Sequence, residues 1–186
     1  MKKIFVLLSL LLPVCSQAQW LDVSADAGYG PYRISAGIKN SNSFCYNVSA
    51  SFVKLKFIDF GVQFTGISTV TLCSVSSPGV FADVIVHDDK NILTFGAQAN
   101  YAFYGDVPLG GAYNKDGSVD TVKIKVENTY SYGLRLGFKR KITKHLYANL
   151  LISPVYSVSP IHFGTVSTNN CAVFYVPLML GASVRF

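Results

Sequence analysis

The carboxy-terminal segment alternates strictly between apolar residues and small or polar ones. Leu178, Leu180, Ala182, Val184 and Phe186 share one parity, while methionine, glycine, serine and arginine occupy the other. Because successive side chains of a β-strand point to opposite faces, this pattern predicts a strand with one unbroken apolar face. That strand ends on an aromatic residue.

Alternation of the same kind recurs along nearly the whole chain after residue 20. It is clearest where Phe60, Val62 and Phe64 alternate with Gly61 and Gln63. An even number of strands is typical of a closed barrel in the outer membrane, so we predict an all-β, antiparallel, up-and-down transmembrane β-barrel. The eight predicted strands lie near residues 21–29, 44–52, 58–65 with an extension toward Cys73, 80–87, 93–103, 130–138, 146–156 and 171–186.

The connections between these strands alternate in length. Such barrels have short periplasmic turns and longer external loops. The alternation therefore places both termini in the periplasm of a Gram-negative bacterium, with residues 74–79 as a short exception among the external loops. The short connections lie at 54–57, 88–91 and 139–144, and the long ones at 30–43, 105–123 and 158–170.

The apolar parity is predicted to face lipid, because a barrel of eight strands has room inside for side chains and little else. An apolar band of this size would be unusual on a soluble monomer, whereas a closed barrel in a bilayer leaves no backbone edge unpaired. Alternation alone does not say which side is wet. A secreted soluble barrel of lipocalin type, with the apolar parity turned inward, is therefore the alternative.

The first 18 residues have the parts of a secretory signal peptide. A basic start precedes an apolar run over residues 4–14, and small residues stand at Ser16 and Ala18 before the expected cleavage site. The apolar run is too short to span a bilayer as a helix. We predict a signal peptide at 1–18 and an outer-membrane barrel domain at 19–186.

The charge balance is mildly basic and argues against a nucleic-acid partner. The formal net charge of +6 falls to +4 when Lys2 and Lys3 leave with the signal peptide. The basic residues gather in short turns, notably Lys139 to Lys141 with Lys144, and no stripe interleaves them with aromatic residues. We interpret them as solvated turns beside an anionic membrane surface.

Charges also fall on the inward parity of the predicted barrel, at Asp22, Asp59, Arg135 and Arg185. All four are expected close to periplasmic strand ends, where two acids and two bases can neutralise one another. The first and last strands of a closed barrel are neighbours, so Asp22 and Arg185 should be in reach. We predict a structural plug in the lumen; an ion pathway is the alternative.

Three cysteines, Cys45, Cys73 and Cys171, remain after signal cleavage, an odd number for an oxidising compartment. Whether two of them form a disulfide is left open. Their spacing lacks any Cys-x-x-Cys or Cys/His pattern, so no metal site is expected. Cys15 would become a lipid anchor in a lipoprotein, but Pro13 and Val14 poorly fit the small-residue positions before it.

A catalytic reading rests on His162 and Ser159, which fall in the last predicted external loop. They invite comparison with barrels that modify lipid in the outer leaflet. Nucleophilic catalysis needs a base within hydrogen-bond reach of the nucleophile, and the chain has no His-x-Ser pairing. We therefore expect no enzyme and no cofactor, with His162 and Ser159 as the residues to test.

By its size, strand number and terminal aromatic residue, the chain resembles small outer-membrane barrels of the OmpA membrane-domain and OmpX kind. In such barrels the assembly machinery reads the terminal aromatic, which here is Phe186. Nothing follows the barrel, so the peptidoglycan-binding half of two-domain members is not expected. The match is architectural, without a family-specific loop motif.

The resemblance implies a non-enzymatic cell-surface protein whose loops work in adhesion or whose barrel supports the envelope. Loops on a rigid scaffold commonly carry binding. The implied partners are outer-membrane lipid and lipopolysaccharide, the barrel assembly machinery, and a host or phage surface ligand. A small conduit for apolar solutes is the alternative, although Gln63, Gln98, Asn100 and Asn149 indicate a filled polar core.

Overall fold

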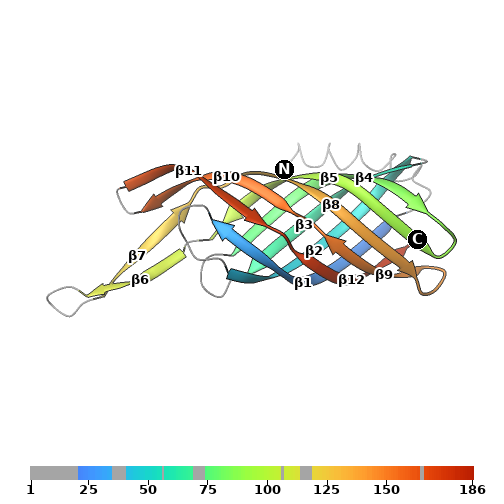
Figure 1. Ribbon diagram of the computed structural model, residues 1–186, viewed down its shortest axis with the longest axis horizontal. Coiled ribbons are helices and arrows are strands. Elements are labelled where there is room, and N and C mark those ends of the chain that lie inside the picture. Colours follow the sequence, from blue (N-terminus) through green and yellow to red (C-terminus); the bar gives the residue numbers. More distant parts are fainter. Residues whose placement is uncertain are drawn as a thin grey trace, which may run out of the picture.

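The chain forms a closed barrel of long antiparallel strands (Figure 1). The computed structural model describes residues 21–34, 41–55, 57–68, 74–105, 107–113, 119–163 and 166–186. The predicted signal peptide lies outside these residues. Within the described ranges, no helix is long and apolar enough to cross a membrane.

Twelve strand segments run through the described residues. In chain order they are β1 (Asp22–Ile34), β2 (Ser41–Leu55), β3 (Ile58–Ser68), β4 (Val75–His87), β5 (Asn91–Tyr104), β6 (Val107–Tyr113), β7 (Val119–Val126), β8 (Thr129–Lys141), β9 (Leu146–Ile152), β10 (Val155–Phe163), β11 (Val166–Tyr175) and β12 (Leu178–Arg185).

The segments combine into a ring of eight wall strands, as predicted. β9 and β10 follow one another along one wall strand, and β11 and β12 along another. β1 pairs with β2 on one side and with β12 and β11 on the other, which closes the ring. β6 and β7 form a hairpin that projects beyond the barrel at the left of Figure 1.

The two interrupted wall strands are interrupted at prolines. Proline has no N–H to give to the ladder, and Pro154 separates β9 from β10 as Pro177 separates β11 from β12. Backbone hydrogen bonds still cross both positions, because Ser153 donates to the Pro177 carbonyl at 3.2 Å and Leu134 to the Pro154 carbonyl at 3.0 Å. The wall is therefore continuous at these points.

The apolar parity faces outward, as predicted. On that face Leu134 is 49% and Phe95 is 52% exposed, whereas Asn47 and Gln98, on the inward parity, are 1% and 4% exposed. A soluble barrel with an apolar core requires the reverse. The outward face is the one that a transmembrane barrel presents to lipid.

The expectation of a filled polar core is wrong for one end of the lumen. At the end of the barrel away from Arg185, many inward positions are apolar and buried, with serines such as Ser43 and Ser77 between them. The rings of Tyr32 and Tyr175 stack there with centroids 6.3 Å apart. We call this cluster the apolar section. Its members are Tyr32, Cys45, Ile67, Val75, Ala102, Val126, Leu151, Val155, Val173, Tyr175 and Met179.

The first and fourth predicted strands were too short, and this explains part of the missed apolar section. β1 continues to Ile34 and β4 begins at Val75, so Tyr32 and Val75 are wall residues and not loop residues. The predicted loop at 105–123 is largely the β6–β7 hairpin. The alternation of apolar and polar residues in Val119–Val126 could have predicted β7. The glycines and the proline of β6 instead indicated a turn.

The β4–β5 turn is closed by Asp88. One carboxylate oxygen of Asp88 accepts the backbone N–H groups of Lys90 at 2.7 Å and Asn91 at 2.6 Å. The side-chain amide of Asn91 donates to the other oxygen at 3.1 Å. These bonds, with the Asn91 amide first, hold the pKa of exposed Asp88 below its usual value, which favours the ionised form that accepts them.

A charge on the outward face should destabilise the barrel in a bilayer. We expect Leu134→Arg, near the middle of β8, to lower the free energy of unfolding by about 2–4 kcal/mol. Leu134→Met is the control and should cost less than about 1.5 kcal/mol. Denaturant titration in phospholipid vesicles measures both. Equal stability of the two variants would contradict a lipid-facing position for Leu134.

Candidate functional site

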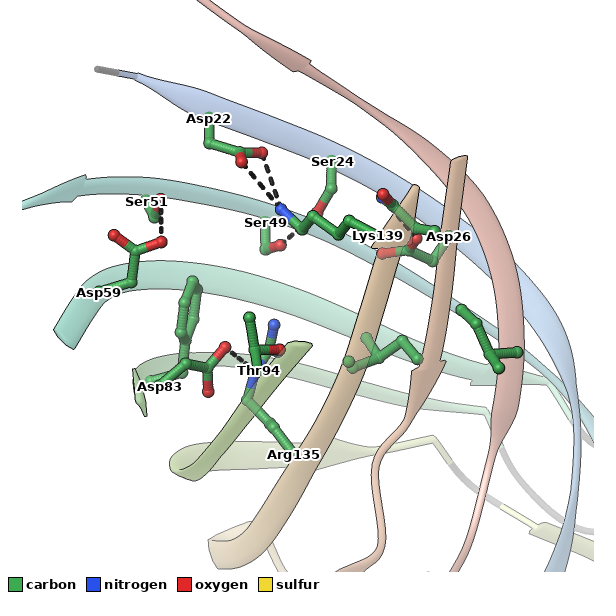
Figure 2. A pocket seen from close by; sticks show the side chains of 15 residues that line it. Asp22, Ser24, Asp26, Ser49, Ser51, Asp59, Asp83, Thr94, Arg135 and Lys139 are labelled. Carbon is green, nitrogen blue, oxygen red and sulfur yellow. Dashed lines mark hydrogen bonds and ion pairs between the residues drawn. The ribbon is translucent and has the colours of Figure 1, made fainter. Parts of the chain in front are cut away.

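A polar section of the lumen lies toward the end of the barrel where β12 ends. It surrounds a cavity of about 30 Å³, which has room for about two water molecules. Figure 2 shows acidic and basic side chains converging on this cavity from different wall strands. Its charged lining residues are Asp22, Asp26, Asp59, Asp83, Arg135 and Lys139.

Asp22 on β1 holds two cations. Lys139 Nζ lies 2.9 Å from both carboxylate oxygens of Asp22, and Arg185 lies 3.1 Å from one of them. Arg185 comes from β12, the neighbour of β1. Lys139 comes from β8, which is separated from β1 by β9 and β12, so the Lys139–Asp22 ion pair crosses the lumen.

Arg135 on β8 makes a second connection across the lumen. Its Nε lies 3.3 Å from an oxygen of Asp83 on β4, and both side chains are almost fully buried. Its terminal nitrogen donates to the side-chain oxygen of Gln63 on β3, beyond β5 and β4 in the ring. The guanidinium also stacks over the Phe81 ring, 4.1 Å from its centroid. That ring packs over Gly61, where a Cβ would clash with it.

Amides and hydroxyls link these charges to the rest of the wall. Gln63 donates to Gln98 at 2.8 Å and to Asn100 at 2.6 Å. Asp26 accepts the amides of Asn47 at 3.4 Å and Asn149 at 3.2 Å. Asn149 lies on β9, beyond β12 from β1, so the second bond passes over Gly181 of β12, which stands in register with both residues. Buried carboxylates and amides require such partners.

The structure brings together part of the predicted charge set. Asp22 and Arg185 form an ion pair, while Arg135 pairs with Asp83, which the predicted set did not include. Arg135 also lies at the middle of its strand, because β8 extends to Lys141. Asp59 accepts a hydrogen bond from Ser51 at 3.3 Å.

Sequence reasoning missed three charged residues of the polar section: Asp26, Asp83 and Lys139. Asp26 stands on the inward parity of the first predicted strand, two positions after Ser24, and parity alone could have found it. Asp83 lay in the weakest predicted strand. Lys139 was assigned to a turn, although it shares the parity of Arg135 and Gly137.

Of the two candidate catalytic residues, the structure describes the side chain of Ser159 alone. The Ser159 side chain is fully buried, and its hydroxyl donates to the backbone carbonyl of Glu127. His162 stands opposite Lys125 on β7 and Ser167 on β11, and its side chain lies outside the described part. A hydroxyl held in this way is not presented to a substrate.

Cys45 is a buried free thiol in the apolar section and donates weakly to the Ser43 carbonyl at 3.6 Å. Cys73 and the side chain of Cys171 lie outside the described residues, so a disulfide involving either of them stays untested. Among the described residues, no three His, Cys, Asp or Glu side chains are grouped to hold a metal ion.

Solved structures of outer-membrane barrels share this fold. Neisserial surface protein A is 19% identical with a TM-score of 0.66, covering 89% of this chain and 97% of that one. OprG from Pseudomonas aeruginosa is 11% identical with a TM-score of 0.54, covering 89% and 95%. AlkL, determined in lipid bilayers, is 10% identical with a TM-score of 0.50, covering 89% and 90%.

No family model and no curated protein sequence matches the chain. At these low identities the similarity to solved structures concerns the fold alone. The protein has the fold of the small eight-stranded outer-membrane β-barrels, of the OmpA and OmpX type.

Removing only Arg135 from the Arg135–Asp83 ion pair should lower the free energy of unfolding more than removing both charges. We expect Arg135→Met to lower the free energy of unfolding by about 3–5 kcal/mol, because it strands the buried Asp83 carboxylate. Adding Asp83→Asn should recover part of that loss. Denaturant titration of both single variants and the double variant in vesicles gives the coupling energy. Strictly additive effects would contradict the pairing.

Proposed function

We propose that this protein is a non-enzymatic outer-membrane barrel with a closed lumen, which acts as a surface-binding or adhesion protein through its extracellular loops or as a structural protein of the envelope. The observation that carries the proposal is the set of side-chain contacts that span the lumen, above all Lys139–Asp22 and Arg135–Gln63. A lumen bridged in this way favours a scaffold over a pore.

Two barriers of different chemistry support closure. In the polar section, the Lys139–Asp22 ion pair and the Arg135–Gln63 hydrogen bond each join strands that lie three apart in the ring. In the apolar section, buried side chains such as Tyr32, Tyr175 and Met179 fill the lumen toward the loops. An ion would have to pass buried apolar side chains after the charges, and burying a charge among them is costly. The interior charges Asp22, Asp59, Arg135 and Arg185 are therefore proposed to be structural.

The projecting hairpin supports a surface role. β6 and β7 extend the wall strands β5 and β8 beyond the ring, and only Ile124 to Val126 of β7 pair with β10. We place this end of the barrel outside the cell and both chain termini in the periplasm, since the opposite end has the short turns. A host or phage surface ligand would meet the hairpin first.

The remaining partners follow from membrane insertion. The outward apolar face would contact outer-membrane lipid, with lipopolysaccharide in the outer leaflet. Phe186 is 66% exposed at the end of β12, and its N–H donates to the Leu21 carbonyl at 2.9 Å. An exposed terminal aromatic on the outward parity suits recognition by the barrel assembly machinery.

The alternative functions lack a supporting observation. A conduit that opens sideways needs a gap in the wall, yet backbone hydrogen bonds cross the interruptions at Pro154 and Pro177. A lipid-modifying enzyme needs an accessible nucleophile, yet the Ser159 hydroxyl is buried. Comparing lipid A masses from cells expressing wild type and a Ser159→Ala/His162→Ala variant tests the enzyme directly; a changed profile would overturn the non-enzymatic assignment.

Conductance measurements test closure. We expect the purified barrel to give no stable nanosiemens-scale openings in planar bilayers. Lys139→Ala should remain silent as well, because the apolar section still fills the lumen and Arg185 still holds Asp22. Stable openings in wild type would refute the closed barrel, and openings only in Lys139→Ala would assign the seal to the ion pair alone.

Replacing the hairpin tests the surface role. We expect a variant with residues 108–123 exchanged for a short Gly/Ser link to keep the heat-modifiable gel migration of a folded barrel. It should lose binding to host cells or phage. The same exchange of residues 142–145, at the other end, is the control and should leave binding unchanged. Binding that survives loss of the hairpin would contradict its role.

A further inference from the structure

Exposed cations gather where the β4–β5 and β8–β9 turns meet. The N–H of Lys141 donates to the carbonyl of Lys90 at 2.8 Å, so the two turns are in direct contact. Lys90, Arg140, Lys141 and Lys144 are all exposed. We call these four residues the basic rim.

Arg140 holds a distinct place in the basic rim. It stands on the outward parity of β8 and directly follows the exposed apolar residues Leu134, Leu136 and Phe138. Two positions later, Ile142 in the turn is 61% exposed. Arg140 is thus at the edge of the lipid-facing band. In a bilayer, the layer of lipid phosphates begins at such an edge.

The neighbours of Arg140 leave its charge available. In register it stands beside Asn91 on β5 and Ala148 on β9, neither of which carries a charge. Lys139, one residue earlier, points into the lumen and is held by Asp22. The inward lysine therefore neutralises the interior, and the outward arginine does not take part in that network.

Acidic residues at the same rim only partly balance the cations. Among the described residues of the two turns, the acids are Asp88 and Asp89. Both carboxylate oxygens of Asp88 accept hydrogen bonds from Lys90 and Asn91 within their own turn. Four exposed cations thus face two acidic side chains, one of which is committed to turn closure, and the C-terminal carboxylate of Phe186, which follows Arg185 beside His145.

We propose that the basic rim binds the phosphate headgroup of an anionic phospholipid in the leaflet that borders this end of the barrel, with Arg140 as the main contact. The planar guanidinium can donate two parallel hydrogen bonds to phosphate oxygens, and the lysines add point charges. A lipid fits better than a soluble anion, because Arg140 continues a row of lipid-facing residues. The proposal rests on the membrane insertion proposed above.

Lipid retention tests the proposal. The full barrel is folded into vesicles of equal parts phosphatidylglycerol and phosphatidylcholine and extracted in mild detergent, and the lipids that remain bound are counted by mass spectrometry. We expect the lipid retained by wild type to be enriched in phosphatidylglycerol. In Arg140→Gln this enrichment should fall roughly fivefold, which is the effect of removing one basic residue near an anionic surface. Raising the salt concentration should reduce the enrichment in wild type.

Arg33→Gln is the matched control, because Arg33 is an exposed arginine at the opposite end of the barrel, on β1. It should keep the wild-type enrichment. An unchanged enrichment in Arg140→Gln, or an equal loss in Arg33→Gln, would overturn the basic rim as a lipid site. Heat-modifiable migration is measured alongside, in the mixed vesicles and in vesicles of pure phosphatidylcholine. A barrel that folds into the vesicles but shows no phosphatidylglycerol enrichment in the mixed ones refutes this inference alone. Failure to fold into either kind of vesicle refutes the membrane barrel itself.

Discussion

Inside hydrocarbon, every backbone N–H and C=O group must find its partner within the protein, and the architecture follows from that constraint. The ring meets it by pairing β12 with β1, from Asp22 beside Arg185 to Tyr29 beside Leu178. Where Pro154 and Pro177 remove a donor, neighbouring strands still bond across the interruption. A wall without open edges is what allows the outward face to be almost wholly apolar.

Closure also decides where charges can lie. The period of two along a strand sends neighbouring residues of β8 to opposite sides, so Lys139 crosses the lumen to Asp22 while Arg140 faces outward. Inward charges are shielded from water and must be paired, whereas an outward charge is tolerated only at the edge of the apolar band. Two adjacent cations therefore have different places: Lys139 pairs inside the lumen, and Arg140 is the residue proposed to contact lipid phosphate.

The interior and the loops divide the work of the molecule. Contacts across the polar section and packing in the apolar section are the basis for the proposal that the barrel is a closed support. The similar solved structures share the fold at low sequence identity, so the proposed role depends on this chain's own lumen and on its projecting hairpin. A closed scaffold leaves the loop end as the surface with which a partner can interact.

The amino-acid sequence by itself predicted the eight wall strands, because alternation with a period of two is a local property. The small interior of an eight-stranded barrel then gave the outward apolar parity, and closure of the ring gave the neighbourhood of Asp22 and Arg185. Only the tertiary structure decided which charges meet across the lumen: Asp83 takes Arg135, and Lys139 belongs to the interior and not to a turn. It also revealed that Tyr32 and Val75 pack inside. These contacts depend on how far each strand continues and on the stagger between strands around the closed ring. The alternation within a single strand determines neither of them.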